Sequence, residues 1–543
     1  MCGIWALLKS KPVLESKYIN SINRIKNRGP DSTIIHVDKN YIVGFHRLAI
    51  NDISVDGNQP FYYSTPTHNY ILIANGEIYN HKELEQKYNI LVESNSDCEI
   101  LLELFIELKE DMNLFNCELR GEYSILIIKQ NKKLDIIEYF ASTDPLSVRP
   151  LFYYVNSNYE VGFSSILGGL SDLSDNVYRL DQGTVISGKI CFNLYGDYRI
   201  NSYSKQIKQL LNNNIDTLYE RIVNTLVDCV KIRLKSDRPI GCLLSGGLDS
   251  SLIAAIAANE LAKKGEKLRT FSIGMEGGTD LAFARIVADH IKSDHTEFIF
   301  GLDEGINAIE DVIVATETYD ITTIRASVGQ YLIAKKIMET TDIKVLLNGD
   351  GADECQMGYL YFYLYPDLNE ALAERNKLLK QIHLFDGLRV DRNISYHGLE
   401  ARVPFLDKNF VDLYMEIPTE LLVPTATNIE KHLIRTAFNI LMPNLLPLEI
   451  LMRKKEAFSD GISSKEKSWY VSVKEHYNKL ITDEEFNTIE DIQGIKPLCK
   501  ESFYYRKRFN ELFGQNQRVI PRYWLPNWTQ TIDPSARTLN VYN

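Results

Sequence analysis

The sequence predicts two domains of different classes, an α+β domain rich in strands followed by an α/β domain built on a doubly wound parallel sheet with added helices. The length of 543 residues suits at least two domains of roughly 100–200 residues each. Short β-type runs separated by turn residues dominate the chain up to residue 194, whereas strand and helix patterns alternate after residue 216. This change of pattern places the domain boundary near residues 195–216.

The N-terminal half is expected to be a sheet-rich domain with a few packed helices. Two segments have helical patterns, 18–27 and 97–109, and the second begins behind a capping Ser96 or Asp97. The expected strands are residues 44–50, 69–74, 122–128, 151–155, 160–163 and 184–187.

A polar stretch rich in Asn, Gln and Lys, residues 196–215, is expected to be a linker because it has little apolar surface to bury. Beyond it, helices and strands alternate as in a parallel sheet, where ligands bind past the carboxyl ends of the strands. Helices then prevail to about residue 515, and a C-terminal tail, 516–543, is expected to be poorly ordered from residue 529. The expected elements are helices 217–234, 250–263 and 281–290 and strands 240–244, 268–273, 295–299 and 343–347.

The composition predicts a soluble protein with neither nucleic-acid nor membrane partners. The 60 Lys and Arg against 72 Asp and Glu give a net charge of −12, which repels phosphates and anionic membranes in bulk but permits a local basic pocket. No apolar run approaches the roughly 20 residues of a transmembrane helix. The first residues do not fit the pattern of a signal peptide, because no Lys or Arg precedes the apolar run and no small-residue cleavage site follows it. The 8 cysteines show neither CxxC pairs nor metal-ligand spacing, so we expect no zinc site, no disulfide framework and a cytoplasmic location.

A candidate phosphate loop, SGGLDSS at 245–251, lies between an expected strand and an expected helix. Loop N–H groups and the positive end of the helix would converge there and form a cradle for an anion. Asp249 would repel phosphate unless a divalent cation lay between them, which indicates Mg²⁺. The Walker pattern GxxxxGK[ST] is absent, so this is another kind of phosphate loop. A glycine turn capped by serine, with no ligand, is the alternative.

A second Gly-rich loop, NGDGADE at 348–354, follows the expected strand 343–347. Its carboxylates, Asp350, Asp353 and Glu354, are costly to crowd together without a cation or a proton-transfer task. The alternative is an acidic turn that is exposed to water and binds no ligand. This alternative is less favoured if the SGGLDSS and NGDGADE loops face the same crevice.

Cys2 would carry a free α-amine if the initiator Met is removed, which a small second residue permits. That amine could act as general base for the thiol of the same residue, and the thiol could then attack a carboxamide. An incidental buried cysteine is the alternative interpretation.

Ordered motifs along residues 2–515 resemble known families. The motifs are MCGI at the start, RGPD (28–31), HRLAI (46–50), NGEIYN (75–80), SDCE (96–99), SGGLDSS, FSIG (271–274), ETYDITTIRAS (317–327), GLEARVPFLD (398–407) and FSDG (458–461). Those in the first half are similar to the glutaminase domain of class II glutamine amidotransferases, and those in the second half to the ATP-pyrophosphatase-type domain of glutamine-hydrolysing asparagine synthetases.

For residues 2–195 the resemblance implies a glutaminase domain with the αββα sandwich of N-terminal nucleophile enzymes. Cys2 would attack the glutamine side-chain amide to form a thioester, releasing ammonia and then glutamate. The implied glutamine-site residues are Arg47 for the α-carboxylate, Glu77 and Asp97 for the ammonium group, Asn75 and Gly76 for the oxyanion hole, and Leu48, Ala49, Ile50 and Asn51 around the pocket.

For residues 216–515 the resemblance implies a synthetase domain and suggests a homodimer. Aspartate would attack the α-phosphorus of ATP to give β-aspartyl-AMP and pyrophosphate, and ammonia would then displace AMP. The ETYDITTIRAS and GLEARVPFLD segments would shape the aspartate site and a dry ammonia tunnel, with Arg402 as a lining residue. The implied ATP-binding residues are Leu243, Ser245, Gly246, Gly247, Asp249, Ser250, Ile273, Asn348, Gly349 and Lys455, with Asp249 and Asp353 on Mg²⁺.

Two places depart from the family pattern. Asp350 stands where the family's GEGSDE has a Glu that is thought to assist adenylation or to accept a proton from ammonia. Because misplacing a catalytic group by about 1 Å can cost about 100-fold in rate, either the backbone compensates or the enzyme is slow, and we expect compensation. The segment TDPLSVRPL (143–151) lacks an Arg and a Gly of the family's RDxxGxxPLY, which puts the contact between the domains in question.

The leading hypothesis is a complete asparagine synthetase that uses glutamine, aspartate and ATP. One alternative is a relative that closes a β-lactam or amidates another carboxylate, but a β-lactam-forming enzyme needs no ammonia and so no glutaminase. The other alternative is a catalytically weakened binding or regulatory protein, which only Asp350 supports.

Overall fold

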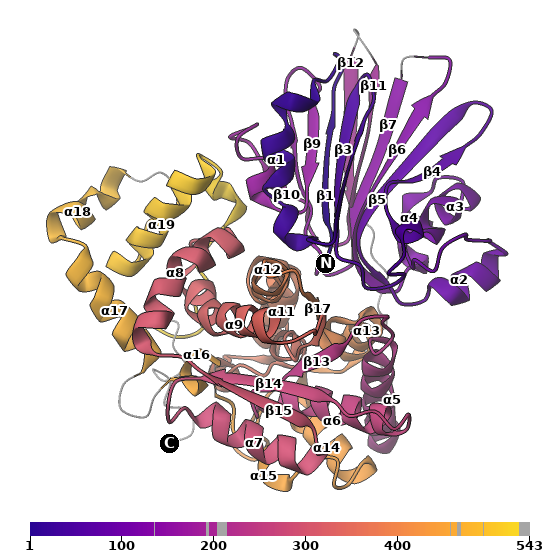
Figure 1. Cartoon of the computed structure of the whole chain (residues 1–543). Coiled ribbons are helices and arrows are strands. Elements are labelled where there is room, and N and C mark those ends of the chain that lie inside the picture. Colours follow the sequence, from indigo (N-terminus) through magenta and orange to yellow (C-terminus); the bar gives the residue numbers. More distant parts are fainter. Residues whose placement is uncertain are drawn as a thin grey trace. The chain divides into compact units, whose positions relative to one another are not determined.

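Two units of different architecture make up the chain in the computed structural model (Figure 1). Residues 1–134, 136–191, 195–202, 214–456, 458–463, 468–491 and 494–530 are described. The first unit comprises Met1–Gln206, Ser395–Leu399 and Phe513–Val519, and the second comprises Ile207–Ile394, Glu400–Leu512 and Ile520–Asn543. Each unit therefore has its own core, although short segments from the second half of the chain pack within the first unit.

The first unit is built on two antiparallel sheets of six strands. One has the order β10-β8-β9-β1-β3-β2 and the other β12-β11-β7-β6-β5-β4. The strands are β1 Gly3–Leu8, β2 Ser32–Val37, β3 Tyr41–Arg47, β4 Phe61–Ser64, β5 His68–Ile78, β6 Gly121–Asn131, β7 Ile136–Thr143, β8 Phe152–Val155, β9 Val161–Ser164, β10 Tyr178–Arg179, β11 Thr184–Cys191 and β12 Tyr195–Ser202.

Alternate residues of the strands enter two cores, because side chains of a strand point to opposite faces. Ile71 of β5 packs between the sheets with residues of β1 and β3, whereas Leu72 packs under α3 on the other face. Gly44 of β3 leaves room for Ile22 of α1, which covers the outer face of the other sheet (Figure 1). The layers therefore run αββα, which confirms the predicted class. The helices are α1 Ile19–Asn23, α2 His81–Tyr88, α3 Ile100–Glu107 and α4 Met112–Glu118.

The second unit contains a five-stranded sheet of order β15-β14-β13-β16-β17, and all neighbouring strands are parallel. From β13 the chain adds strands first on one side and then on the other, as in a doubly wound sheet. The switch point, where ligands bind in such folds, therefore lies between β13 and β16. The strands are β13 Ile240–Leu243, β14 Arg269–Gly274, β15 Asp294–Ile299, β16 Val345–Leu347 and β17 Glu400–Arg402.

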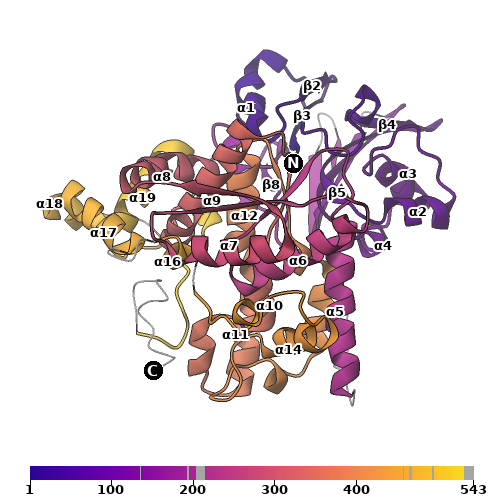
Figure 2. The same ribbon diagram turned by 60° about the horizontal axis from the view of Figure 1, so that its bottom comes forward.

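Helices cover both faces of this sheet, with α6 and α7 on one face and α9 on the other (Figures 1 and 2). None of the described helices is long and apolar enough to cross a membrane. The helices are α5 Ile215–Ile232, α6 Leu248–Ala262, α7 Thr279–Ile291, α8 Leu302–Thr316, α9 Ile321–Thr340, α10 Ala352–Gln356, α11 Leu368–Gln381, α12 Asp386–Ser395, α13 Lys408–Glu416, α14 His432–Leu441, α15 Leu448–Leu451, α16 Phe458–Gly461, α17 Trp469–Leu480, α18 Asp483–Asn487 and α19 Lys500–Phe513.

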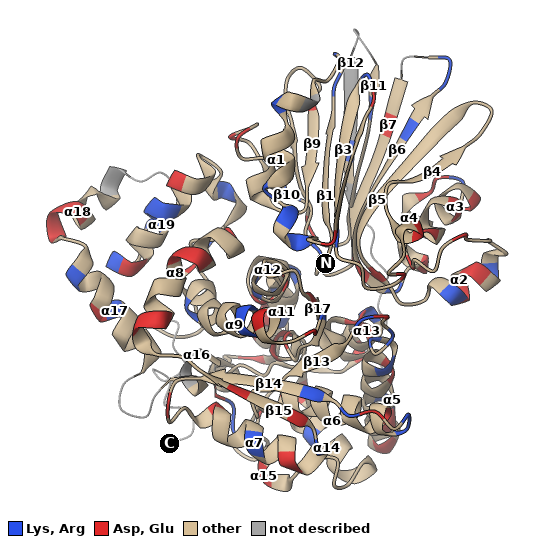
Figure 3. Ribbon diagram, viewed as in Figure 1, with Lys and Arg blue, Asp and Glu red and all other residues tan. Residues whose placement is uncertain are grey.

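Some elements differ from the expectations. Strand β1 was not predicted, and all six of its residues are buried and uncharged (Figure 3). The helix expected at 18–27 ends at Asn23, and a short 3₁₀ turn follows before Pro30. The first residues of the expected linker form β12, and residues 203–213 lie outside the described residues.

Candidate active sites

Cys2 lies directly before β1, beside the motif that follows β3. Pairing of the two strands sets Gly3 opposite His46, so the chain start meets the end of β3. The Cys2 thiol donates to the carbonyl of Leu48 at 3.7 Å, and Arg28 Nε donates to the Cys2 carbonyl at 3.1 Å. The MCGI and HRLAI motifs, which begin 45 positions apart in the sequence, therefore lie side by side.

Asn75 and Gly76 lie on β5, on the sheet that faces β1. The Asn75 side chain is fully buried, and neither its amide nitrogen nor its oxygen has a hydrogen-bond partner among the described residues. Such a buried group costs roughly 1–3 kcal/mol, which an oxygen atom of a ligand would offset. Gly76 has a φ of 153°, and a Cβ there would lie 2.0 Å from the Glu122 carbonyl, so only glycine fits. The buried Asn75 amide and the glycine geometry at position 76 are compatible with the predicted oxyanion hole.

Two buried carboxylates, Glu77 and Asp97, lie beside this hole. The Asn51 amide donates to Glu77 Oε2, and Asp97 Oδ2 accepts a backbone N–H of β5 at 2.6 Å. Burial raises the pKa of the Cys98 thiol well above its usual value, and the charges of Asp97, Glu77 and Cys2 raise it further. The two carboxylates therefore lie near the chain start and make a negative environment suited to an ammonium group.

The Arg47 guanidinium is engaged with the loop that follows β3. Its Nη1 donates to the Ser54 carbonyl at 2.5 Å and to Asn58 Oδ1 at 2.9 Å, and its Nη2 donates to the Asp52 carbonyl. To bind a carboxylate, Arg47 would have to exchange some of these partners. The other residues predicted around the pocket are Leu48, Ala49 and Ile50, which are buried, and Asn51, which is half-buried.

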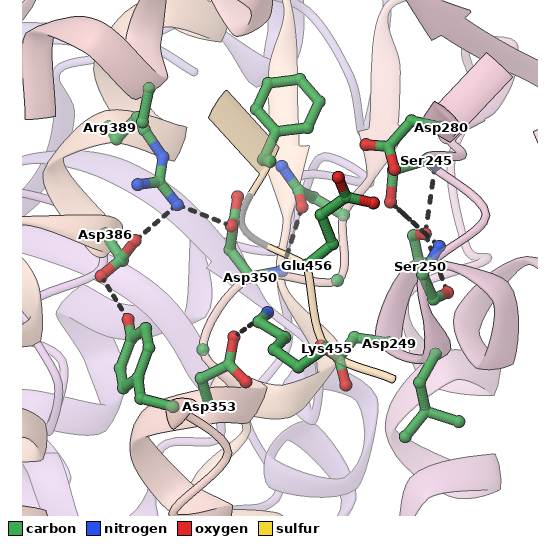
Figure 4. A pocket seen from close by; sticks show the side chains of 18 of the residues that line it. Ser245, Asp249, Ser250, Asp280, Asp350, Asp353, Asp386, Arg389, Lys455 and Glu456 are labelled. Atoms are coloured by element: carbon green, nitrogen blue, oxygen red, sulfur yellow. Dashed lines mark hydrogen bonds and ion pairs between the residues drawn. The ribbon is translucent and has the colours of Figure 1, made fainter. Parts of the chain in front are cut away.

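In the second unit, a cavity of about 240 Å³ opens at the switch point of the sheet (Figure 4). The SGGLDSS loop leads from β13 into α6, and the NGDGADE loop follows β16. A Cβ at Gly349 would lie 2.7 Å from the backbone nitrogen of Ser250, so the loops touch. The predicted residues that line the cavity are Leu243, Ser245, Gly247, Asp249, Ser250, Ile273, Asn348, Gly349, Asp350, Asp353 and Lys455.

Gly246 is the one predicted ATP-site residue outside this lining. It has a φ of +74°, and a Cβ there would lie 2.5 Å from the backbone nitrogen of Ala284. Gly246 thus permits the tight turn and the close packing against α7. Within the loop, the hydroxyls of Ser245 and Ser250 lie 3.0 Å apart, and Gly247 N–H donates to Ser245 Oγ at 3.3 Å. The loop is preshaped at the start of α6, as anion binding requires.

Two lysines pair with the carboxylates of the loops, and one of them, Lys431, joins the two loops. Lys431 Nζ lies 2.6 Å from Asp249 Oδ2 and 2.5 Å from Asp353 Oδ1, and Lys455 Nζ lies 2.5 Å from Asp353 Oδ2. Burial would raise the pKa of Asp353, but the two ammonium groups outweigh it and hold that pKa well below its usual value. The centre therefore keeps the Asp353 carboxylate ionised and places two lysine ammonium groups beside the loops.

The carboxylates of this centre also fit Mg²⁺. Asp249 Oδ1 is buried without a hydrogen-bond partner among the described residues, and carboxylate oxygens are the protein ligands that Mg²⁺ prefers. No cluster of three or more His, Cys, Asp or Glu in the described part of the chain could hold a metal by itself. This suits an ion held by one or two carboxylates together with the phosphates of a substrate.

Asp350 is held from two sides by residues that the sequence analysis missed. Arg389 Nη2 lies 3.0 Å from Asp350 Oδ1 (Figure 4). Gln330 Nε2 donates to Asp350 Oδ2 at 2.8 Å. Arg389 also pairs with Asp386 at 2.5 Å, and Tyr359 Oη donates to Asp386 at 3.0 Å. Burial raises the pKa of Asp350, and Arg389 opposes this shift only in part.

Sequence reasoning had little signal for these residues or for Lys431. Asp386 and Arg389 are three positions apart on α12, so they could have been recognised as a pair, but nothing in the sequence links them to Asp350. Lys431 is 182 residues from Asp249, with which it pairs.

On the other side of the cavity, burial raises the pKa of Asp280 to about 7, although Arg453 lies 2.9 Å away and lowers it.

Arg402, predicted to line a tunnel, lies outside the lining of the cavity. Its Nε donates to Glu400 Oε1 at 2.8 Å and its Nη1 to the Arg233 carbonyl at 2.9 Å, so it ties β17 to the end of α5. Arg325 of ETYDITTIRAS pairs with Glu501 of α19 at 2.6 Å. Both arginines brace the second unit, and the tunnel role of Arg402 stays a prediction.

Two family models match the chain. The model described as "Asparagine synthase" matches residues 221–381 and 376–536, and the model described as "Glutamine amidotransferase domain" matches residues 1–222. The two matches correspond to the synthetase and glutaminase parts expected from the motifs.

Full-length relatives carry both parts. The asparagine synthetase (glutamine-hydrolysing) of Gallus gallus is 38% identical over 572 residues, covering 100% of this chain and 99% of that protein. The probable asparagine synthetase of Acanthamoeba polyphaga mimivirus is 40% identical over 567 residues, covering 100% of both chains, and the Homo sapiens enzyme is 38% identical over 569 residues, covering 100% of this chain and 99% of that protein. Both family models match this chain, and its relatives are 38–40% identical over their full length. The chain therefore belongs to the glutamine-hydrolysing asparagine synthetases.

Proposed function

We propose that this chain catalyses the complete reaction, in which ATP, L-aspartate, L-glutamine and water become AMP, diphosphate, L-asparagine and L-glutamate. The observation that supports the proposal is that each unit brings its own set of predicted site residues together. In the first unit the Cys2 thiol donates to the Leu48 carbonyl, and the buried Asn75 amide has no partner among the described residues. In the second unit the serine loop and the acidic loop line one cavity. A homodimer and a cytoplasmic location stay predictions.

The glutaminase half begins when Met1 is removed and Cys2 gains a free α-amine. The amine takes the thiol proton, and Cys2 Sγ attacks the amide carbon of glutamine. Asn75 Nδ2 and the Gly76 N–H stabilise the oxyanion, and one such donor is worth about 3 kcal/mol. The tetrahedral intermediate releases ammonia, and water then cleaves the thioester to give glutamate.

The synthetase half begins with ATP in the SGGLDSS loop and its adenosine part against Leu243 and Ile273. A β-carboxylate oxygen of aspartate attacks the α-phosphorus, and the bond to pyrophosphate breaks. Lys431 and Lys455 neutralise the charge that develops on the phosphates. Asp249 and Asp353 would hold Mg²⁺, which supplies further neutralisation of phosphate charge when bound.

Ammonia completes the reaction by attacking the β-carbonyl carbon of β-aspartyl-AMP. Asp350 accepts a proton from the attacking nitrogen, and AMP leaves. Burial raises the pKa of Asp350, a shift in the direction that makes a carboxylate a better base. The catalytically weakened alternative rests only on the short side chain at this position. Arg389 and Gln330 each hold one carboxylate oxygen of Asp350 in position. These contacts favour the hypothesis that the surrounding structure compensates for the short side chain.

The complete reaction is tested by product analysis with amide-¹⁵N glutamine. We expect ¹⁵N in asparagine, and diphosphate in an amount equal to asparagine, when aspartate and Mg-ATP are supplied. A channelled reaction retains most of the label when unlabelled ammonium is added at the concentration of glutamine. Absence of asparagine above background would exclude the synthetase assignment.

Asp350→Glu tests whether the short carboxylate is a handicap. We expect kcat for ammonium-dependent asparagine formation to stay the same or to fall, because the longer side chain would not fit between Arg389 and Gln330. Asp350→Asn is expected to lower kcat by about 100-fold. Steady-state kinetics with saturating ammonium measure both variants, and a gain of about tenfold or more in Asp350→Glu would show that this chain is a slow member of its family.

A further inference from the structure

A segment near the end of the described chain, residues 520–529, crosses the second unit and is called the strap here. The Trp524 N–H donates to Asp320 Oδ1 at 2.7 Å, and the Trp524 carbonyl accepts from Thr322 Oγ1 at 2.8 Å. The Ile520 carbonyl accepts from Tyr319 Oη at 3.1 Å. The strap is therefore bonded through its backbone to the start of α9, within the ETYDITTIRAS motif.

Aromatic contacts add to these bonds. The Trp524 ring lies 5.3 Å from Tyr359 and 6.3 Å from Tyr361, measured between ring centroids. Trp528 lies 5.9 Å from Tyr361 and 5.7 Å from Phe362. Trp524 is only 8% exposed, so these contacts bury a large apolar side chain. The strap thus contributes several buried side chains, Ile520, Tyr523, Trp524 and Pro526, although it belongs to no helix or strand.

Only part of the strap reaches the cavity. Trp524 and Pro526 line it, whereas Trp528 packs on the same aromatic cluster without lining it. Trp524 contacts Tyr359, which donates to Asp386, and Asp386 pairs with Arg389, the partner of Asp350. The strap therefore bounds the part of the cavity next to Asp350.

This part lies across the cavity from the phosphate loop. In Figure 4, Arg389 and Asp386 lie on one side, Ser245 and Ser250 on the other, and Asp350, Asp353 and Lys455 between them. If ATP binds at the SGGLDSS loop, the Arg389 side of the cavity remains available for the amino-acid substrate. Charged groups of both signs, Arg389 and Asp386, suit an amino acid with a carboxylate and an ammonium group.

We propose that the strap closes the amino-acid subsite of the synthetase and that Trp524 is a specificity-determining wall which limits this subsite to an acid of the length of aspartate. The inference rests on the proposed synthetase function and adds a residue that none of the recognised motifs contains. Because a rigid indole ring fills the space beyond the substrate, one extra methylene in the acid would meet it. A pocket wall of this kind discriminates by about 10- to 200-fold per methylene.

The test compares Trp524→Ala, Trp524→Phe and, as a matched control, Trp528→Ala. We expect Trp524→Ala to raise KM for aspartate about tenfold or more, to leave KM for ATP within about threefold, and to increase diphosphate release with glutamate in place of aspartate. Trp524→Phe should lie between the wild type and Trp524→Ala. Trp528→Ala should lower the unfolding temperature but leave KM for aspartate within about threefold.

Other outcomes would overturn the inference. An unchanged KM for aspartate in Trp524→Ala, or an equal rise in KM for aspartate and ATP, would show that Trp524 is no wall of the amino-acid subsite. The same rise in Trp528→Ala would assign the effect to general loosening of the strap. Should Trp524→Ala fail to fold, Trp524→Phe and its response to glutamate decide the question. If the wild type forms no asparagine, the synthetase proposal itself fails, which separates the two conclusions.

Discussion

Replacing Cys2 with Ala is expected to lower glutamine-dependent asparagine formation by about a thousandfold or more, because the proposed reaction passes through a thioester on the Cys2 thiol. Ammonium chloride should still support asparagine formation at close to the wild-type rate, since the second unit has its own core and its own cavity. Glutamate release and asparagine formation, measured in parallel by chromatography, check both parts of this expectation. Alanine is also a small second residue, so removal of Met1 should be unaffected.

Cys117→Ala is the matched control, because Cys117 is the exposed cysteine of the first unit. It should leave both activities unchanged. Retention of glutamine use by Cys2→Ala would exclude Cys2 as the nucleophile. Loss of the ammonium-dependent reaction in Cys2→Ala would contradict independent sites and would indicate that the synthetase site depends on an intact chain start.

Asp249→Asn is expected to have the opposite effect to Cys2→Ala, because it should impair the synthetase reaction and spare glutamine hydrolysis. It should lower diphosphate release and asparagine formation by about 100-fold or more with either nitrogen source, while glutamine hydrolysis in the first unit continues. The substitution keeps the shape of the side chain but removes one of the two carboxylates that share Lys431 and that would hold Mg²⁺. Diphosphate release with saturating ammonium, and glutamate release without ATP, measure the two halves.

Asp303→Asn serves as control, because Asp303 is an exposed aspartate in the first turn of α8. It should leave both reactions at wild-type rates. A variant Asp249→Asn that retains full diphosphate release would exclude Asp249 from the phosphate site. Recovery of its activity at higher Mg²⁺ concentration would instead support a weakened metal site, because mass action can restore binding but cannot replace a catalytic group.

The domain classes were readable because they depend on local patterns. Strands β5 and β6 alternate between two cores, and the repeat of strand and helix from residue 217 onward can bury its apolar faces only in a layered α/β fold. Strand β1 was not predicted, although all six of its residues are buried, as are those of the predicted strand β3. Most of the predicted site residues lie within short motifs. A loop that bends sharply or presents a nucleophile accepts only certain residue types at a few neighbouring positions, so it can be recognised in the sequence.

Residues that join distant segments were out of reach of such patterns. Lys431 lies between the two loops, and Arg389 and Gln330 hold Asp350 from different helices. Their positions depend on how α9, α12 and the start of α14 pack, which no local pattern specifies. The strap is the clearest case. Polar and aromatic residues near a chain end suit a tail, yet Trp524 is buried against Tyr359 and lines the cavity.

The amino-acid sequence thus established the two-domain organisation, the family and the loops that carry the chemistry, because each depends on residues close together in the chain. The folded structure added the partners of Asp350, the lysine shared by Asp249 and Asp353, and the tryptophan wall of the cavity. These contacts join residues from 20 to 204 positions apart, and their specificity comes from packing, burial and charge in three dimensions.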